Sequence, residues 1–147
     1  MSLWTWQELN VALGLAVGDA GPDISGVSID SRTLQAGDLF VALSGDPGPR
    51  FHSSFQGARD GHDFLAGAIA AGAAAVLVDR EVDSAVPQLR VGDTLDGLWD
   101  LARFARKRIS GRVVAITGSS GKTTARVYIE HVLGEQGVVH GSEGSLN

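Results

Sequence analysis

The sequence predicts an α/β protein with a mainly parallel sheet, and three observations support that fold class. Short apolar stretches, such as residues 75–78 and 113–116, alternate along the chain with segments of helical periodicity. Turns rich in Gly and Pro separate these segments, most clearly over residues 44–53. The 147 residues are 44% hydrophobic and 20% charged, which provides enough apolar material for a packed core and argues against disorder. Strands that alternate with helices are typical of parallel sheets.

The first part of the chain predicts one helix and two strands. Thr5 and Glu8 have the T-x-x-E spacing of a capping box, so we expect a helix over residues 6–13. Residues 27–30 alternate apolar and polar side chains, as a half-buried strand does. After a short turn, residues 39–43 form an apolar run that predicts a second strand.

The sequence after residue 43 predicts further strands that alternate with helices, and a division of the chain into two domains. The expected elements are a helix over 63–71, a strand over 75–78, a short strand over 89–91, a helix over 95–107, a strand over 113–116, a helix over 122–133 and a strand over 138–140. Pro87 lies in the stretch that joins two of these units, so we place a boundary near residues 84–90. The predicted domains are residues 1–85 and 86–147.

Composition and charge exclude several classes of protein. The chain has no cysteine, which excludes disulfides and thiolate metal sites, and its net charge is −5. Its first residues lack the pattern of a signal peptide, and its longest apolar run, residues 64–78, is too short to span a membrane. We therefore expect a cytoplasmic protein with no membrane partner. Residues 101–128 carry only basic charges, but an acidic chain with one basic block is not typical of a nucleic-acid binder.

The strongest chemical signal is a glycine-rich turn between an expected strand and an expected helix. It consists of Thr117, Gly118, Ser119, Ser120, Gly121, Lys122, Thr123 and Thr124. In this context such a turn predicts a phosphate-binding loop, with Lys122 reaching the β- and γ-phosphates of a nucleotide and the Thr123 hydroxyl ligating Mg²⁺. The strict pattern G-x-x-x-x-G-K-S/T requires Gly where this chain has Ile116. The alternative is a glycine turn with an exposed lysine.

A second set of polar residues follows the strands of the first domain. Asp30, Ser31 and Arg32 come at the end of one strand. Taken alone they are a polar strand end, and Asp60 begins a turn that leads to Asp63 as a helix N-cap. Their functional use would be hydroxyl, guanidinium and backbone contacts to a polar ligand.

Three blocks of sequence carry a family resemblance. The order S-I-D-S-R-x-x-x-x-G-D-L-F-V-A-L-x-G, then D-G-H-D-F-x-x-x-A-x-x-x-G-A, then A-I-T-G-S-S-G-K-T-T resembles the start of the Mur ligases, the ATP-dependent amide-forming enzymes of peptidoglycan synthesis. The resemblance runs from about Trp4 to Asn147. In this family the phosphate loop reads T-G-x-x-G-K-S/T, so Ile116 is no departure. Residues 89–95, Ser120 and the closing residues 144–147 most resemble the MurF branch.

The resemblance implies a small N-terminal MurF/MurE-like domain that holds the UDP end of a precursor, followed by the start of a P-loop central domain. It implies uridine-nucleotide contacts by position at Ile29, Ser31, Arg32, Asp46, Pro47 and Gly48. ATP would phosphorylate the terminal carboxylate of UDP-N-acetylmuramoyl-tripeptide, and the amine of D-Ala-D-Ala would attack the acyl phosphate. The implied cofactors are ATP and Mg²⁺, and the parent enzyme would be a monomer.

The family's remaining catalytic groups lie beyond Asn147, so we expect no catalytic residue within the chain and no turnover by the chain alone. Two alternatives stay open: another Mur-type ligase similar to MurE, and a non-catalytic nucleotide-binding module. His52, His62 and His131 are too dispersed to predict a metal site, and we expect satisfied or surface histidines. The strand over 113–116 would lack parallel neighbours, so exposed apolar surface and self-association are expected.

Overall fold

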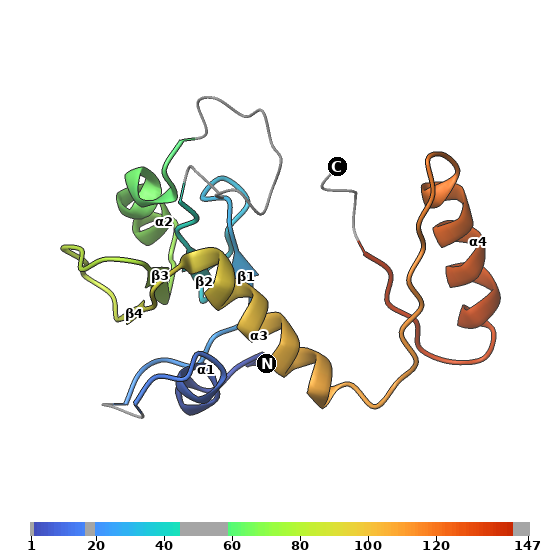
Figure 1. Cartoon of the computed structure of the whole chain (residues 1–147), viewed down its shortest axis with the longest axis horizontal. Coiled ribbons are helices and arrows are strands. Elements are labelled where there is room, and N and C mark those ends of the chain that lie inside the picture. The colour runs from blue at the N-terminus through green and yellow to red at the C-terminus, as the bar shows by residue number, and fades with distance from the viewer. Residues whose placement is uncertain (1, 17–19, 45–58, 143–147) are drawn as a thin grey trace. The chain divides into compact units, whose positions relative to one another are not determined.

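The computed structural model describes residues 2–16, 20–44 and 59–142. Asp46, Pro47 and Gly48, the predicted loop contacts, lie outside the described residues. The chain divides into two compact units, Met1–Ile109 and Ser110–Asn147, and each is described here by itself (Figure 1).

The first unit is built on a four-stranded parallel sheet. Its strands are β1 (Val27–Ser28), β2 (Leu39–Val41), β3 (Ala75–Val78) and β4 (Gln88–Arg90), and they pair in chain order (Figure 1). Val27 pairs with Leu39, Phe40 with Val76, and Leu77 with Leu89. The predicted α/β class and the parallel sheet are confirmed. Because all four strands run the same way, their carboxyl ends lie along one edge of the sheet, which we call the carboxyl edge.

Successive side chains of the central strands β2 and β3 point to opposite faces of the sheet and are buried in two separate cores. One core faces α1 (Trp6–Ala12) and α3 (Thr94–Arg108), and its buried members are Trp4, Leu9, Ile24, Leu39, Val41, Ala75, Leu77, Leu89 and Leu101. The other faces α2 (Leu65–Ala70), and its buried members are Leu34, Phe40, Ala42, Leu65, Ala68, Ala73, Val76 and Val78. The two-residue period of a strand explains the division. The first unit is therefore a sheet with helices on both faces.

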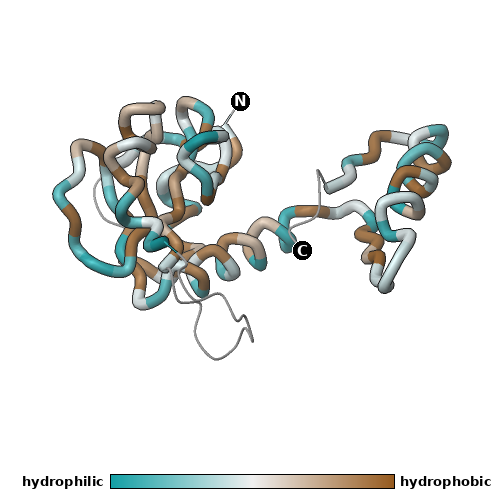
Figure 2. Tube along the Cα trace, turned by 90° about the horizontal axis from the view of Figure 1, so that it is seen from above, coloured by the Kyte–Doolittle hydropathy of each residue, from teal (hydrophilic) through white to brown (hydrophobic). Residues whose placement is uncertain are grey.

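Local capping explains where the helices begin. The Thr5 side chain accepts from the Glu8 N–H and the Glu8 carboxylate accepts from the Thr5 N–H, so the predicted capping box starts α1. Asp93 caps α3 by accepting from the backbone N–H groups of Leu95 and Asp96. Apolar and polar residues alternate along α3 (Figure 2). Leu101 of this helix is buried in the core.

Two details of the first unit differ from expectation. The compact unit extends to Ile109, past the predicted boundary near residues 84–90, because β4 pairs with β3 and α3 packs on the same sheet. The helix expected from Asp63 begins instead as a 3₁₀ turn, η1 (Gly61–Phe64). Asp60 caps that turn by accepting from the His62 N–H, so Asp63 is not the N-cap.

The second unit contains one described helix, α4 (Lys122–Gly134), which confirms the helix expected over residues 122–133. The strands expected over residues 113–116 and 138–140 are wrong, since neither segment forms a strand. A strand needs a hydrogen-bonded neighbour, and among the described residues neither segment has one.

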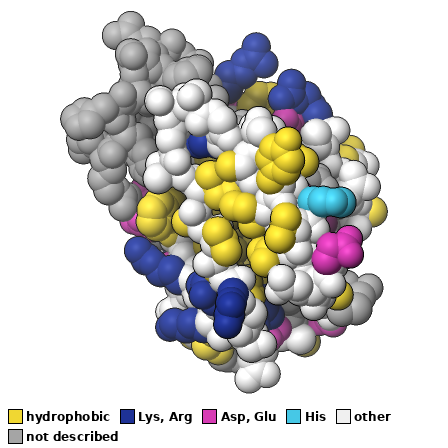
Figure 3. Space-filling view, turned by 90° about the vertical axis from the view of Figure 1, so that its right-hand side faces the viewer, with side chains coloured by type: hydrophobic (Ala, Val, Ile, Leu, Met, Phe, Trp, Pro, Cys, Tyr) yellow, Lys and Arg dark blue, Asp and Glu magenta, His cyan; other side chains and the backbone are white. Residues whose placement is uncertain are grey.

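Apolar side chains of the second unit are exposed, as expected. They include Val113, Val114, Val127, Tyr128, Val132, Leu133, Val138 and Val139. Figure 3 shows hydrophobic side chains gathered on one face of the molecule. Within the described ranges, no helix has the length and apolar character needed to cross a membrane.

Candidate functional site

The glycine-rich turn leads directly into α4. Gly121 is the residue before the helix and has φ 75°, in the left-handed region that favours glycine. The N–H of Ala125 donates to the Gly121 carbonyl, so the N–H groups of residues 122–124 precede the first intrahelical bond. Those N–H groups and the positive end of a 13-residue helix together suit an anion.

Lys122 closes the turn. Its ammonium donates to the Gly118 carbonyl at 2.8 Å, four residues back along the chain. This contact closes the glycine turn at the start of α4. It also keeps the ammonium of Lys122, the only basic group among residues 117–124, next to the backbone of the turn. The other predicted residues, Thr117, Ser119, Ser120, Thr123 and Thr124, are all exposed. The structure therefore brings the eight predicted residues into one accessible turn whose donors suit the phosphates of a nucleotide.

A polar contact that the sequence did not predict lies farther along α4. The Arg126 guanidinium donates to the Glu130 carboxylate at 2.9 Å and to the Ser142 carbonyl at 2.6 Å. Gly141 passes so close to Glu130 that a Cβ on it would overlap the Glu130 carboxylate. The chain after α4 is thus held against this helix, and Gly141 allows the close approach.

Three of the other predicted contacts, Ile29, Ser31 and Arg32, lie among the described residues at the carboxyl edge of the first unit. Ile29, directly after β1, is 45% exposed, and Ser31 is partly buried. Arg32 forms a two-pronged pair with Asp30, with Nε 2.9 Å from Oδ1 and Nη2 2.6 Å from Oδ2. Hydrogen bonds from the Arg32 side chain and backbone lower the pKa of Asp30 to about 2. Asp30 thereby holds the backbone turn that presents Ser31 and Arg32.

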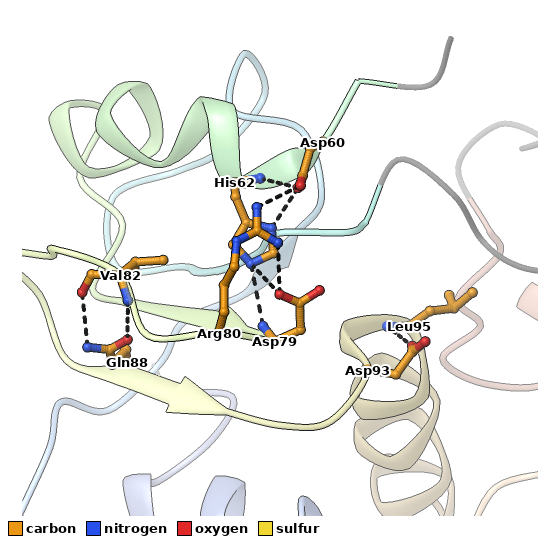
Figure 4. Close-up of polar contacts among 8 residues, drawn as sticks. All are labelled: Asp60, His62, Asp79, Arg80, Val82, Gln88, Asp93 and Leu95. Carbon is orange, nitrogen blue, oxygen red and sulfur yellow. Dashed lines mark hydrogen bonds and ion pairs between the residues drawn. The ribbon is translucent and has the colours of Figure 1, made fainter. Parts of the chain in front are cut away.

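Four charged or titratable side chains meet beyond β2 and β3, and we call them the edge cluster: Asp60, His62, Asp79 and Arg80 (Figure 4). His62 is its centre, with a side chain only 4% exposed. Its Nδ1 lies 2.6 Å from Asp60 Oδ1, and its Nε2 accepts from the Asp79 N–H at 3.4 Å and lies 3.3 Å from Asp79 Oδ1. The expectation that His62 is a satisfied histidine is confirmed.

Arg80 links the same two carboxylates from outside. Its guanidinium donates to Asp60 Oδ2 at 2.7 Å and to Asp79 Oδ1 at 3.0 Å. Burial raises the pKa of Asp60, but hydrogen bonds from Arg80 and from the backbone and ring of His62 outweigh it, so this pKa lies well below its usual range. Asp60 is therefore ionised, and since a carboxylate can only accept, His62 Nδ1 carries a proton.

Sequence reasoning missed Asp79 and Arg80. The one available signal was their position, since an acid and a base directly follow the fully buried strand β3. Within the described part of the chain, no group of three or more His, Asp or Glu side chains could hold a metal ion.

Comparison with known proteins gives close relatives. No protein-family model matches the chain. It is 42% identical over 129 residues to the UDP-N-acetylmuramoyl-tripeptide–D-alanyl-D-alanine ligase of Escherichia coli K12, covering 86% of this chain and 26% of that protein. The protein of the same name from Bacillus subtilis is 40% identical over 127 residues, which are 84% of this chain and 25% of that protein. The UDP-N-acetylmuramoyl-L-alanyl-D-glutamate–2,6-diaminopimelate ligase of Syntrophomonas wolfei is 37% identical over 141 residues, with coverage of 93% and 27%. The chain spans about a quarter of the length of these relatives.

Solved structures of MurF are also similar to this chain. MurF from Acinetobacter baumannii matches with a TM-score of 0.68 and 32% identity, over 90% of this chain and 28% of that one. MurF from Thermotoga maritima, solved in complex with ADP, matches with a TM-score of 0.61 and 34% identity, over 82% of this chain and 26% of that one. Sequence and structure thus agree that the chain matches MurF-type Mur ligases and corresponds to the N-terminal portion of those enzymes.

Proposed function

We propose that the chain forms the N-terminal part of a cytoplasmic, ATP-dependent ligase that joins D-Ala-D-Ala to UDP-N-acetylmuramoyl-tripeptide in peptidoglycan synthesis. The observation that carries the proposal is the glycine turn at the start of α4, in a chain that matches MurF ligases in both sequence and structure. The Thermotoga maritima relative was solved with ADP, which supports a nucleotide as the ligand of this turn.

The residues of the turn fit a Mg²⁺-nucleotide. Gly121 supplies the backbone angle, α4 supplies N–H donors, and Lys122 supplies a positive charge. For Lys122 to reach the β- and γ-phosphates, its ammonium exchanges the Gly118 carbonyl for phosphate oxygens. The Thr123 hydroxyl is exposed and would ligate Mg²⁺, which neutralises phosphate charge when bound. The chemical contribution of the turn is thus positioning and charge neutralisation.

The uridine end of the precursor would lie at the carboxyl edge of the first unit. Ile29 offers an exposed apolar side chain, Ser31 a hydroxyl, and Arg32 a guanidinium already oriented by Asp30. Asp46, Pro47 and Gly48 would complete the contacts. Ligands of open parallel sheets generally bind at the carboxyl ends of the strands, which supports this placement. Residues 1–85 would carry the precursor-binding part. Residues 86–147 would carry the linker helix, which packs on the first unit as α3, and the start of the ATP-binding part.

The chain itself would not turn over. In the parent enzyme the tripeptide carboxylate would be activated as an acyl phosphate and attacked by the amine of D-Ala-D-Ala. None of the described residues is proposed as a catalytic group. The match to a diaminopimelate-adding ligase favours one second candidate, a MurE-like ligase that adds a single amino acid in place of the dipeptide.

Calorimetric titration of the chain with Mg²⁺-ATP tests the nucleotide site. We expect Lys122→Ala to weaken binding by about tenfold or more, because a charge-assisted contact to phosphate is lost. Lys107→Ala, which removes a basic residue of α3 outside the turn, is the matched control and should leave the affinity unchanged. Equal affinity of wild type and Lys122→Ala would contradict the assignment of the turn.

A further inference from the structure

The edge cluster is the feature of the first unit that the proposed contacts do not use. A buried histidine with a partner on each ring nitrogen, between two carboxylates that share one arginine, is more than helix capping requires. Asp60 alone already caps η1 through the His62 N–H. The ring of His62 and the guanidinium of Arg80 add two further links, and both lead to Asp79.

These links join chain segments that are distant in sequence. Asp60 and His62 precede α2, whereas Asp79 and Arg80 directly follow β3, so the cluster connects the two sides of the β2–α2–β3 crossover. Gly61, between Asp60 and His62, donates its N–H to the Leu43 carbonyl at 2.7 Å. A Cβ on Gly61 would lie 2.6 Å from the Leu43 nitrogen, so only glycine permits this approach.

The contacts therefore fix residues 60–62 against the ends of two neighbouring strands. Leu43 follows β2 and Asp79 follows β3. Both belong to the carboxyl edge, where Ile29 and Ser31 follow β1, the strand that pairs with β2. Burial of the His62 ring makes the link stiff, because a buried side chain with both nitrogens engaged cannot change rotamer without losing hydrogen bonds.

We infer that His62 is a positioning residue of the uridine-nucleotide site: by bridging Asp60 to the backbone of Asp79, it holds the carboxyl edge in the arrangement that binds the UDP end of the precursor. The inference rests on the proposed function, since it presupposes a nucleotide at this edge. His62 does not touch the ligand, and its effect passes through the positions of the strand ends. Arg80 supports the same bridge from the solvent side.

Titration of the whole chain with UDP-N-acetylmuramoyl-tripeptide tests the inference when it is combined with thermal unfolding. We expect His62→Ala to weaken binding by about tenfold or more, since both links of the ring are lost. His62→Asn can place an amide donor near the position of Nδ1 and keep the Asp60 contact, so it should recover part of the affinity.

Arg108→Ala is the matched control for a general loss of stability. Arg108 ends α3, whose first residue lies just past β4, and a 15-residue helix places the two ends about 20 Å apart. This variant should lower the melting temperature and leave the affinity for the precursor unchanged. If His62→Ala unfolds, His62→Asn and Arg80→Ala provide the same comparison in milder form.

The outcomes separate the two proposals. A wild-type chain that does not bind the precursor contradicts the proposed uridine-nucleotide site itself. A wild-type chain that binds, with folded His62→Ala and His62→Asn chains that bind equally well, overturns the positioning role and leaves the site intact. A loss of affinity in Arg108→Ala as large as that in His62→Ala would also overturn it, because the effect would then follow stability alone.

Discussion

The guanidinium of Arg108 lies 4.0 Å from the centre of the Trp4 ring. Trp4 is near the beginning of the first unit in sequence, and Arg108 is near its end. The same guanidinium donates to the Leu3 carbonyl at 3.1 Å and to the Glu8 carboxylate at 3.3 Å. Trp4 is buried and also packs against Phe104 of α3, with ring centroids 5.7 Å apart. Arg108 therefore fastens the N-terminal segment to the last turn of α3.

Arg108→Ala should lower the free energy of unfolding of the first unit by about 1–2 kcal/mol, because it removes a stacked cation–π contact and two hydrogen bonds. Urea unfolding followed by Trp fluorescence measures the change. Arg103→Ala is the control, since Arg103 lies 5.6 Å from the ring centre of the exposed Trp99 and should cost less than about 0.5 kcal/mol. Equal losses in the two variants would contradict the role given to Arg108.

Gly121→Ala should damage both the stability and the nucleotide affinity of the second unit. Gly121 has φ 75°, and an alanine held there costs about 1–2 kcal/mol or pulls the turn out of shape. Gly134→Ala at the other end of α4 is the control, because a Cβ there meets nothing within 4 Å and its φ is not positive. Circular dichroism and Mg²⁺-ATP titration measure the two effects, and a harmless Gly121→Ala would refute the importance of this backbone angle.

The stability of the first unit should fall in acid. The pKa of Asp30 is depressed to about 2 from 3.8, and that of Asp60 is also lowered, so both carboxylates favour the folded state while ionised. Their contribution is present above pH 3.8 and is lost as the pH falls toward about 2. The urea concentration at the midpoint of unfolding should therefore decrease as the pH is lowered from neutral toward about 2.

Asp30→Asn and Asp60→Asn identify the carboxylates responsible. Each variant should be less stable than wild type at neutral pH and should lose less stability on acidification, because it has one fewer carboxylate to protonate. Asp23→Asn provides a comparison at a carboxylate outside both pairs. An acid response that is unchanged in both variants would show that other groups control it.

Most of the first unit could be predicted because its signals are local. The T-x-x-E spacing of Thr5 and Glu8 fixes the start of α1, and the apolar runs at β2 and β3 are strands buried on both faces, which read as continuous apolar segments. The glycine turn before α4 was predicted for the same reason. Its residues are consecutive, and the chemistry depends on their order.

The wrong predictions concern segments whose structure depends on residues far away in the sequence, which a local sequence pattern does not reveal. Residues 113–116 have the composition of a strand, but they form none because the described residues offer no neighbouring strand to pair with. The edge cluster was missed for a related reason. His62 and Asp79 are 17 residues apart, and only the crossover between β2 and β3 brings them together. Pairing across a fold requires its topology, which local periodicity does not supply.

The most direct measurement is phosphate release from ATP by the enzyme that carries this chain as its N-terminal part. We expect phosphate only when UDP-N-acetylmuramoyl-tripeptide and D-Ala-D-Ala are both present, and no product by mass spectrometry from the 147-residue chain alone. Equal turnover with a single amino acid in place of D-Ala-D-Ala would contradict the MurF-type function and would favour the MurE-like alternative.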